Sequence, residues 1–334
     1  MNSADVEKLE DVIVRSAEQL AGSIRAARQA VSTVIFGQER VVDNALVTIL
    51  AGGHALLIGV PGLAKTRLVE TLGVTLGLDA KRVQFTPDLM PSDILGAEVL
   101  DESAAGKRSF RFIPGPVFAQ LLMADEINRA SPRTQSALLQ AMQEQHITVA
   151  GARHDLPVPF HVLATQNPLE QEGTYPLPEA QLDRFLMEID VGYPDRDAER
   201  KILFDTTGAE QTTAKTAMTA DTLITAQRLV RRLPVGDSVV EAILTLVRSA
   251  RPGEDGGSAD AKSIAWGPGP RASQALMLAV RARALLDGRL APSIDDVLEL
   301  AEPVLKHRMA LTFSARAEGE TVSGVIGRLK ARIG

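Results

Sequence analysis

Short apolar runs alternate with helical stretches from about residue 31 to residue 192. Each run is bounded by polar or turn-forming residues, which is typical of buried strands. The candidate strands are His54–Gly59, Arg82–Thr86, Gln120–Ala124, Phe160–Thr165 and Leu186–Val191. Because helical stretches separate them, the pattern predicts an α/β fold with a doubly wound, parallel, five-stranded sheet.

Two segments do not follow this alternation of strands and helices. Within Ala97–Ile113, polar-apolar runs flank a turn at Asp101–Lys107, and His146–Val158 has a similar pattern. Both patterns favour hairpins. Hairpins that project from an α/β core usually contact another molecule.

The second part of the chain, from about residue 194, has a helical pattern without strand signals. Val240, Ile243 and Leu244, for example, share one predicted helical face. The stretch Arg251–Pro270 is rich in Gly, Pro, Asp and Ser, which favours a loop. The predicted domains are an N-terminal helix (1–30), an α/β core (31–193) and a small all-α lid domain (194–334).

The composition of the chain limits the kinds of protein to which it can belong. It has no cysteine, which excludes disulfides and thiolate metal sites, and its formal net charge of -6 gives no general attraction to nucleic acid. Ala45–Ala64 has no formal charge, but Gly52 and Gly53 interrupt it, so a helix followed by a buried strand is favoured over a membrane span. The N-terminus is polar and mixed in charge, unlike a signal peptide. We therefore expect a cytoplasmic protein without membrane insertion.

The segment Gly59–Thr66 carries the strongest chemical signal in the chain. It reads Gly-Val-Pro-Gly-Leu-Ala-Lys-Thr and lies between a predicted strand and a predicted helix. Small residues allow successive backbone N–H groups to converge on phosphate oxygens at the start of that helix. Lys65 would reach the β- and γ-phosphates of ATP, and the Thr66 hydroxyl would bind Mg²⁺. Ala64 replaces the usual glycine, and we expect it to adopt the helical φ and ψ that alanine tolerates.

Two further predicted strands end in polar residues. Asp125 and Glu126 end the first, where Asp125 can hold Mg²⁺ and Glu126 can orient or deprotonate an attacking water. Asn167 follows the second, and its amide could bind the γ-phosphate; a turn formed by Asn167 and Pro168 is the alternative. Both strand ends therefore predict polar groups beside the phosphates.

Two arginines are further candidates for the site. Arg184 could form a surface ion pair with Asp183 or act as an arginine finger on the ATP of a neighbouring subunit, which requires an oligomer. Arg271 follows Pro270 at the predicted start of a lid helix. It could reach the γ-phosphate across the interdomain cleft, or it could remain a solvated side chain.

Together these motifs closely resemble those of the MoxR family of AAA+ ATPases over about residues 30–315. Even the alanine before Lys65 agrees with that family's own loop variant, although Gly267–Pro270 departs from the Gly-Ala-Ser-Pro that relatives often have. The segments that carry the resemblance are Gly59–Thr66, Ala124–Ala130, Thr134–Leu139, Ala164–Pro168 and Pro178–Phe185.

The resemblance implies an AAA+ P-loop NTPase fold in which Asn167 is sensor 1, Arg184 the arginine finger and Arg271 sensor 2. The two hairpins would be the family's helix-2 insertion, within Asp93–Pro116, and its pre-sensor insertion at 146–158. Gly37 and Gln38 look like the family segment that lies along the adenine. The full set of implied nucleotide-binding residues is Gly37, Gln38, Gly59, Val60, Pro61, Gly62, Leu63, Ala64, Lys65, Thr66 and Arg67.

The resemblance also implies Mg²⁺-dependent ATP hydrolysis by a homo-oligomer, typically a hexameric ring. Such proteins act as chaperones that mature or activate a client protein complex, often with a von Willebrand factor A domain partner. Other functions stay open: a nucleic-acid-remodelling ring ATPase with Lys107, Arg108 and Arg111 on the first hairpin, a magnesium-chelatase-like subunit, or a scaffold that binds ATP without hydrolysing it. The net negative charge disfavours the first, and the intact Asp125–Glu126 pair disfavours the last.

Overall fold

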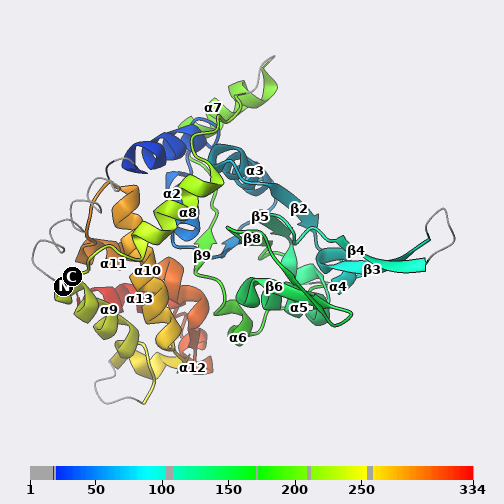
Figure 1. Ribbon diagram of the computed structural model, residues 1–334. Coiled ribbons are helices and arrows are strands. Elements are labelled where there is room, and N and C mark those ends of the chain that lie inside the picture. The colour runs from blue at the N-terminus through cyan, green and yellow to red at the C-terminus, as the bar shows by residue number, and fades with distance from the viewer. Residues whose placement is uncertain are drawn as a thin grey trace, which may run out of the picture.

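A computed structural model describes residues 18, 20–102, 108–170, 172–208, 212–253 and 259–333. All of the predicted strands are present within a few residues of their expected bounds. They are β1 (Ala55–Ile58), β2 (Ala80–Gln84), β5 (Leu121–Asp125), β8 (His161–Gln166) and β9 (Met187–Asp190). These five strands form one parallel sheet in the order β2-β5-β8-β1-β9 (Figure 1). The predicted doubly wound sheet is therefore confirmed.

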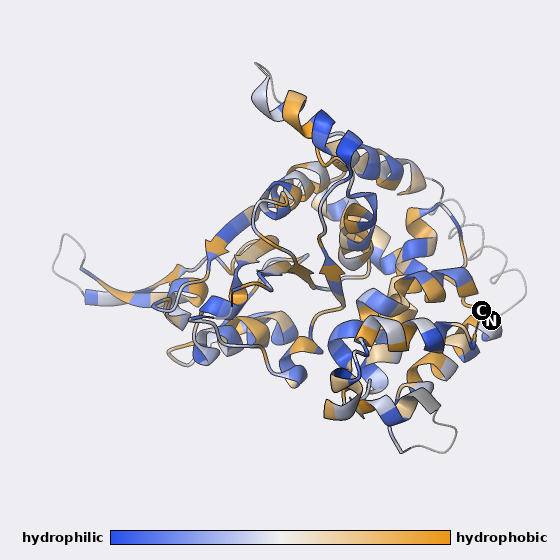
Figure 2. Ribbon diagram, turned by 180° about the vertical axis from the view of Figure 1, so that it is seen from behind, coloured by the Kyte–Doolittle hydropathy of each residue, from blue (hydrophilic) through white to orange (hydrophobic). Residues whose placement is uncertain are grey.

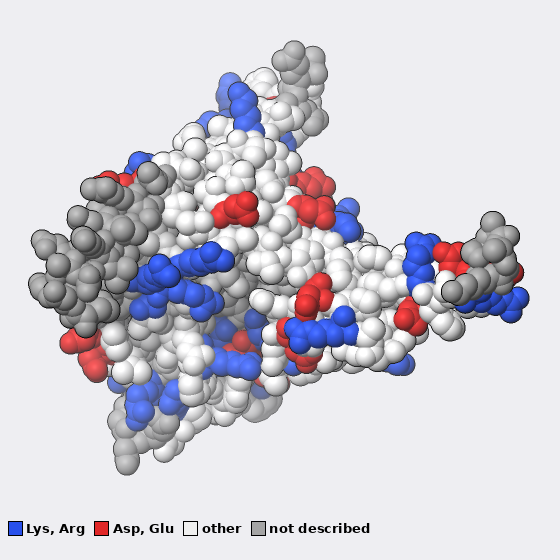
Figure 3. Space-filling model, viewed as in Figure 1, with Lys and Arg blue, Asp and Glu red and all other residues white. Residues whose placement is uncertain are grey.

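Two antiparallel hairpins leave this sheet, as the sequence predicted. One pairs β3 (Gly96–Glu102) with β4 (Arg108–Pro114), and the other pairs β6 (His146–Val149) with β7 (Ala152–Asp155). Figure 2 shows hydrophobic residues along the first hairpin as it projects from the body of the molecule. Figure 3 shows positive and negative side chains close together on that hairpin, where Arg108 pairs with Glu102 and Arg111 with Asp101. Most of the predicted turn, residues 103–107, lies outside the described residues.

The sheet lies between two buried clusters because successive side chains of a strand point to opposite faces. Leu56 of β1 belongs to one cluster and Leu57 to the other. The first cluster is covered by α4 (Pro91–Leu95) and α5 (Pro132–Glu144). The second is covered by α2 (Glu39–Leu50) and α3 (Lys65–Leu76). It extends without interruption into the helices of the second domain.

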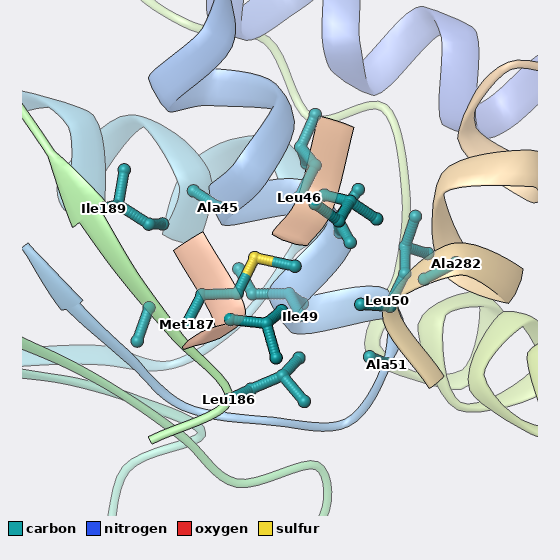
Figure 4. Packing of buried hydrophobic residues seen from close by; sticks show 14 of the residues in the cluster. Ala45, Leu46, Ile49, Leu50, Ala51, Leu186, Met187, Ile189 and Ala282 are labelled. Carbon is teal, nitrogen blue, oxygen red and sulfur yellow. The ribbon is translucent and has the colours of Figure 1, made fainter. Parts of the chain in front are cut away.

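Figure 4 shows how the second cluster joins the two parts of the chain. Leu46 and Ile49 of α2 lie close to Met187 of β9, and Ala282 of α10 lies beside Leu50. Gly53 follows this helix, and a Cβ atom there would lie 2.7 Å from the Cβ of Leu186. The uncharged stretch Ala45–Ala64 is therefore the end of a helix, a strand and the phosphate loop. None of the helices within the described ranges is long and apolar enough to cross a membrane.

The second part of the chain is mainly helical. Its longer helices are α7 (Arg196–Thr207), α8 (Ala220–Val230), α9 (Asp237–Ser249), α10 (Pro270–Leu286), α11 (Ile294–Leu305) and α13 (Val322–Lys330), with short turns η3 (Lys306–Arg308) and α12 (Phe313–Ala317). Figure 1 shows α8 to α13 gathered in one part of the molecule, where α8 and α10 contact α2, whereas α7 projects from the molecule next to α3. Of the predicted N-terminal helix, residues 20–32 are helical, and residues 1–17 and 19 lie outside the described residues.

Three details of the second part differ from the expectations. A short antiparallel pair, β10 (Ile264–Trp266) with β11 (Ala310–Leu311), interrupts the predicted all-helical pattern, because strands this short carry no readable alternation. The predicted loop Arg251–Pro270 contains β10 and a 3-10 turn, η2 (Ala259–Ser263). In α9, Ile243 is buried as predicted, but Leu244 is 39 % exposed, and the buried face also includes Val239 and Leu246. The domain boundary at 193/194 lies between β9 and α7 and stays a prediction.

Candidate functional site

The strand order creates a crevice at the carboxyl edge of the sheet. After β1 the chain crosses toward one edge of the sheet to form β2, and after β8 it crosses toward the opposite edge to form β9. The direction of the crossings therefore changes between the adjacent strands β1 and β8. Ligands of open α/β sheets bind at such a switch point. A cavity of about 450 Å³ opens there. Its walls come from the loop after β1 and from the ends of β2, β5 and β8: Pro61, Gly62, Leu63, Ala64, Lys65, Thr66, Arg67, Arg82, Gln84, Asp125, Glu126, Thr165 and Asn167.

The loop after β1 is bent tightly onto the sheet. Gly62 has a φ of 85°, a left-handed conformation that glycine adopts without strain. A Cβ atom at Gly59 would lie 2.6 Å from the carbonyl oxygen of Val191, so only glycine fits there. The Lys65 ammonium donates to the carbonyl oxygens of Gly59 and Val60, the latter at 3.2 Å. Burial lowers the pKa of Lys65, whereas the nearby Asp125 and Glu126 raise it.

Ala64 differs from the expectation. It is the residue before α3 and has φ 57° and ψ 20°, which is left-handed and not right-handed helical. The sequence argument treated it as an ordinary first helical residue, but the loop must reverse its direction before the helix begins at Lys65. An L-residue in this conformation costs about 1–2 kcal/mol, because its Cβ crowds the following carbonyl oxygen.

Asp125 is held by three side-chain bonds at the end of β5. Its Oδ1 accepts from the Thr165 hydroxyl at 2.5 Å, and its Oδ2 accepts from Arg82 at 2.6 and 3.1 Å. The residue is only 8 % exposed. Thr165 Oγ1 also accepts from the Glu126 backbone N–H at 2.9 Å, so one hydroxyl joins the two carboxylate-bearing residues.

Glu126 lies beside Asp125 with its backbone in the left-handed region, at φ 54°. Its carboxylate Oε2 accepts from Gln84 at 2.7 Å and from Arg129 at 3.0 Å. Sequence reasoning did not assign roles to Gln84, Arg82 or Thr165. The parallel pairing of β2, β5 and β8 brings these residues together. Thr165 had a readable signal as the polar end of a predicted strand, whereas Arg82 and Gln84 lie within the predicted strand Arg82–Thr86.

Asn167 and Gln38 both lie beside the loop after β1. Asn167 lines the cavity, is 5 % exposed, and accepts from the Leu169 backbone N–H at 3.1 Å, so it forms both the predicted turn and part of the wall. Gln38 is buried at the start of α2 and donates to the carbonyl oxygen of Leu63 at 3.4 Å. Its Oε1 is buried without a hydrogen-bond partner among the described residues. An amino group of a bound base would satisfy that oxygen.

Arg184 and Arg271 do not line the cavity around the loop. Both line a separate cavity of about 270 Å³ with Asp183 and the buried Arg308. Arg271 is 3.7 Å from the Asp183 carboxylate. In this structure Arg271 does not reach the cavity around the loop of its own chain, and its predicted role on the γ-phosphate stays a prediction. Arg271 lies away from that cavity because the start of α10 packs beside the segment before β9, which the sequence pattern could not show.

Comparisons with known proteins agree with the fold. Residues 54–187 match the family described as ATPases associated with various cellular activities (AAA), and residues 257–328 match the AAA lid domain. The chain is 42% identical over 317 residues to Chaperone MoxR1 of Mycobacterium tuberculosis, covering 94% of this chain and 83% of that protein. It is 32% identical to Protein MoxR of Paracoccus denitrificans, covering 86% and 88%. A crystal structure of a candidate ATPase from Cytophaga hutchinsonii is similar over 99% of this chain and 98% of that chain, with TM-score 0.89 and 36% identity.

Proposed function

Because this chain belongs to the MoxR family of AAA+ ATPases, we propose that it hydrolyses ATP with Mg²⁺ and uses the energy to remodel a client protein complex. One observation carries the proposal. The phosphate loop, the Asp125–Glu126 pair and Asn167 surround a single cavity at the switch point of the sheet. The loop and Asn167 are about a hundred residues apart in the sequence, with the Asp125–Glu126 pair between them, so only the fold brings all three together.

The residues of the cavity fit a nucleoside triphosphate with its metal ion. Backbone N–H groups of the loop and the start of α3 would bind the phosphates, and Lys65 would neutralise them. Thr66 and Asp125 offer the oxygen ligands that Mg²⁺ prefers, although Arg82 binds the same carboxylate. When bound, the ion supplies positive charge on the phosphate oxygens. Gly37 and Gln38 would lie along the adenine.

Glu126 is the group we propose to activate the attacking water. Its carboxylate would accept the proton of that water, and Asn167 would position the γ-phosphate for in-line attack. In this structure Gln84 and Arg129 hold the Glu126 carboxylate through its Oε2.

Arg184 is proposed to act on the ATP of a neighbouring subunit, and Arg271 to act as sensor 2 on a γ-phosphate across the interdomain cleft. They share a cavity with the buried Arg308 and one carboxylate, Asp183, so the cavity has an excess of positive charge. A γ-phosphate presented by a second copy of the chain would match this charge. The proposal therefore includes a homo-oligomer, typically a hexameric ring, and the hairpins as contacts for the client. A von Willebrand factor A domain partner remains part of the proposal.

Two substitutions in the cavity test the assignment. Lys65→Ala should abolish ATP binding, because the phosphates lose their main positive charge, whereas Glu126→Gln should bind ATP tightly and lose turnover. Calorimetry with ATP and a phosphate-release assay measure the two properties. Equal ATP affinity of the wild type and Lys65→Ala would rule out the phosphate loop. Unchanged turnover in Glu126→Gln would remove Glu126 from the chemistry.

A further inference from the structure

Arg308 is a buried arginine of the second domain with an unusual set of partners. It lies on η3 and is 2 % exposed. Its Nε donates to Asp183 Oδ1 at 2.7 Å. Its two other nitrogens donate to the carbonyl oxygens of Asp183 at 3.2 Å, Phe185 at 2.7 Å and Leu186 at 3.1 Å. Two further bonds, to the carbonyl oxygen of Val304 at 2.6 Å and to His307 Nε2 at 2.7 Å, join it to its own domain. Four of these six partner atoms therefore belong to the short segment from residue 183 to residue 186.

This segment, which we call the finger turn (residues 183–186), carries Arg184. It connects α6 (Glu179–Leu182) to β9. The backbone N–H groups of Arg184 and Phe185 bond to α6, and that of Leu186 bonds to the carbonyl oxygen of His54. The carbonyl oxygens on its other side bond to Arg308. His307 Nε2 also lies 3.1 Å from the Phe185 carbonyl oxygen, so the finger turn is held jointly by the core and by side chains of the lid, of which Arg308 makes the most bonds.

A buried arginine is a costly way to stabilise a turn. Taking a guanidinium out of water carries a large desolvation penalty, and apolar residues of similar volume often give equal or greater stability. Burial lowers the pKa of Arg308, and the Asp183 carboxylate opposes this effect. What the planar guanidinium adds is direction, because its N–H groups form a rigid fork.

Asp183 also contacts Arg271, a second arginine of the lid. Its Oδ2 is 3.7 Å from Arg271, at the start of α10, while its Oδ1 is bound by Arg308. Two separate elements of the lid therefore contact the residue directly before Arg184. A rotation of the lid against the sheet would break or move these contacts together.

We propose that Arg308 is a positioning residue that links the lid of one subunit to the Arg184 which that subunit offers to its neighbour. The inference rests on the proposed role of Arg184 in the neighbouring site. Nucleotide binding or release that moves the lid would then shift Arg184 and change hydrolysis in the next subunit. Arg308 thereby gives the ring a route for passing the nucleotide state from one subunit to the next.

The test compares Arg308→Lys, which keeps the charge but loses the fork, with the control Lys306→Met. Lys306 lies on the same turn but binds Glu188 and Asp190 of β9 and not the finger turn. We expect Arg308→Lys to bind ATP like the wild type and to lose turnover roughly tenfold to a hundredfold, because Arg184 is misplaced. We expect Lys306→Met to keep wild-type turnover.

Mixed rings distinguish positioning from general damage. A Glu126→Gln subunit cannot hydrolyse ATP but presents an intact finger turn, so adding it should raise turnover per Arg308→Lys subunit. The same addition should rescue Arg184→Ala. A purely structural defect in Arg308→Lys would stay in its own site and would not be rescued.

The outcomes separate the inference from the proposed function. If Arg184→Ala retains full turnover, the proposed finger role is wrong. Suppose instead that Arg184→Ala is inactive and is rescued in mixed rings. If Arg308→Lys is then not rescued, or if its turnover is no lower than that of Lys306→Met, only the inference about Arg308 fails. Should Arg308→Lys not fold in a thermal unfolding assay, Asp183→Asn, which weakens the same contact from the other side, is subjected to the same rescue test and the same criteria.

Discussion

At the scale of single residues, Ala64 has the least expected conformation in the proposed ATP site. Its left-handed backbone lies directly before Lys65 and Thr66, the two residues proposed to bind phosphate and metal. Glu126, the proposed catalytic residue, is also left-handed, at φ 54°. Non-glycine residues in this region persist only where the surrounding structure compensates for the strain. Two of them in one cavity are consistent with a site whose geometry is held by the fold.

Replacing Ala64 with glycine should stabilise the protein. Glycine adopts φ 57° without strain, and the gain exceeds the added entropy of the unfolded chain, so Ala64→Gly should raise the free energy of unfolding by about 0.5 kcal/mol. The control Ala137→Gly, within the right-handed helix α5, should lower it by about 1 kcal/mol. Denaturant titration measures both. Equal losses in the two variants would show that Ala64 carries no strain.

At the scale of secondary-structure elements, the hairpin of β3 and β4 combines a packed base with an exposed outer part. Near the base, the Phe112 ring stacks on His154 of β7 with centroids 3.9 Å apart. Further out on the same face, Phe110 and Leu100 are opposite each other and are 71 % and 56 % exposed. Such an exposed apolar pair suits contact with a client, whereas the paired charges of Arg108 and Arg111 give little attraction for nucleic acid.

Two substitutions in this hairpin should differ in their cost. Phe112→Ser should lower the free energy of unfolding by about 1–2 kcal/mol, because it loses the ring contacts with His154 and Phe118. Phe110→Ser should change it by less than about 0.5 kcal/mol, because this ring is already in water. Chemical denaturation compares them. A large loss in Phe110→Ser would mean that the outer hairpin is packed against another part of the molecule.

At the scale of the whole molecule, two buried histidines join the sheet to the elements around it. His161 of β8 donates from Nδ1 to the Gly53 carbonyl oxygen at 2.8 Å and accepts at Nε2 from Gln227 of α8 at 3.0 Å. His54 accepts from the Val162 backbone N–H and contacts the carbonyl oxygen of Met142. Burial lowers the pKa of His161 to about 4 and, with the nearby His161, that of His54 to about 3. Both rings are therefore neutral near pH 7.

Acid should weaken the fold through these two rings. The unfolded chain binds protons near pH 6.5, whereas the folded chain binds them only near pH 4 and pH 3. Their contribution to stability is thus complete above pH 6.5 and is lost as the pH falls toward 4. At pH 5 each histidine should remove about 2 kcal/mol from the free energy of unfolding.

Urea denaturation at pH 7 and pH 5 measures this loss. His161→Gln keeps a polar side chain that cannot titrate. From pH 7 to pH 5, the free energy of unfolding of this variant should therefore fall by about 2 kcal/mol less than that of the wild type. A variant with the same pH dependence as the wild type would show that His161 is not the group responsible.

The strands and the phosphate loop could be predicted because their signals are local. The five apolar runs, the glycines around Pro61 and the carboxylates after β5 can each be recognised within a few residues of sequence. Element ends and short elements could not be predicted equally well. Leu244 faces solvent because tertiary packing selects which apolar residues of a helix are buried, and β10 with β11 is too short for a periodic pattern.

By itself, the sequence determined the parallel sheet, the hairpins and the position of the loop proposed to bind ATP, since hydrophobic period and motif spacing are properties of neighbouring residues. Only the tertiary structure decided which distant residues meet. It placed Thr165, Arg82 and Gln84 on the two carboxylates, turned Ala64 into the left-handed region, and put Arg271 beside Asp183 and not at its own phosphate loop. It also bound Arg308 to the turn of Arg184, about 120 residues earlier in the chain. Contacts of this kind depend on strand order and domain packing, which no local pattern encodes.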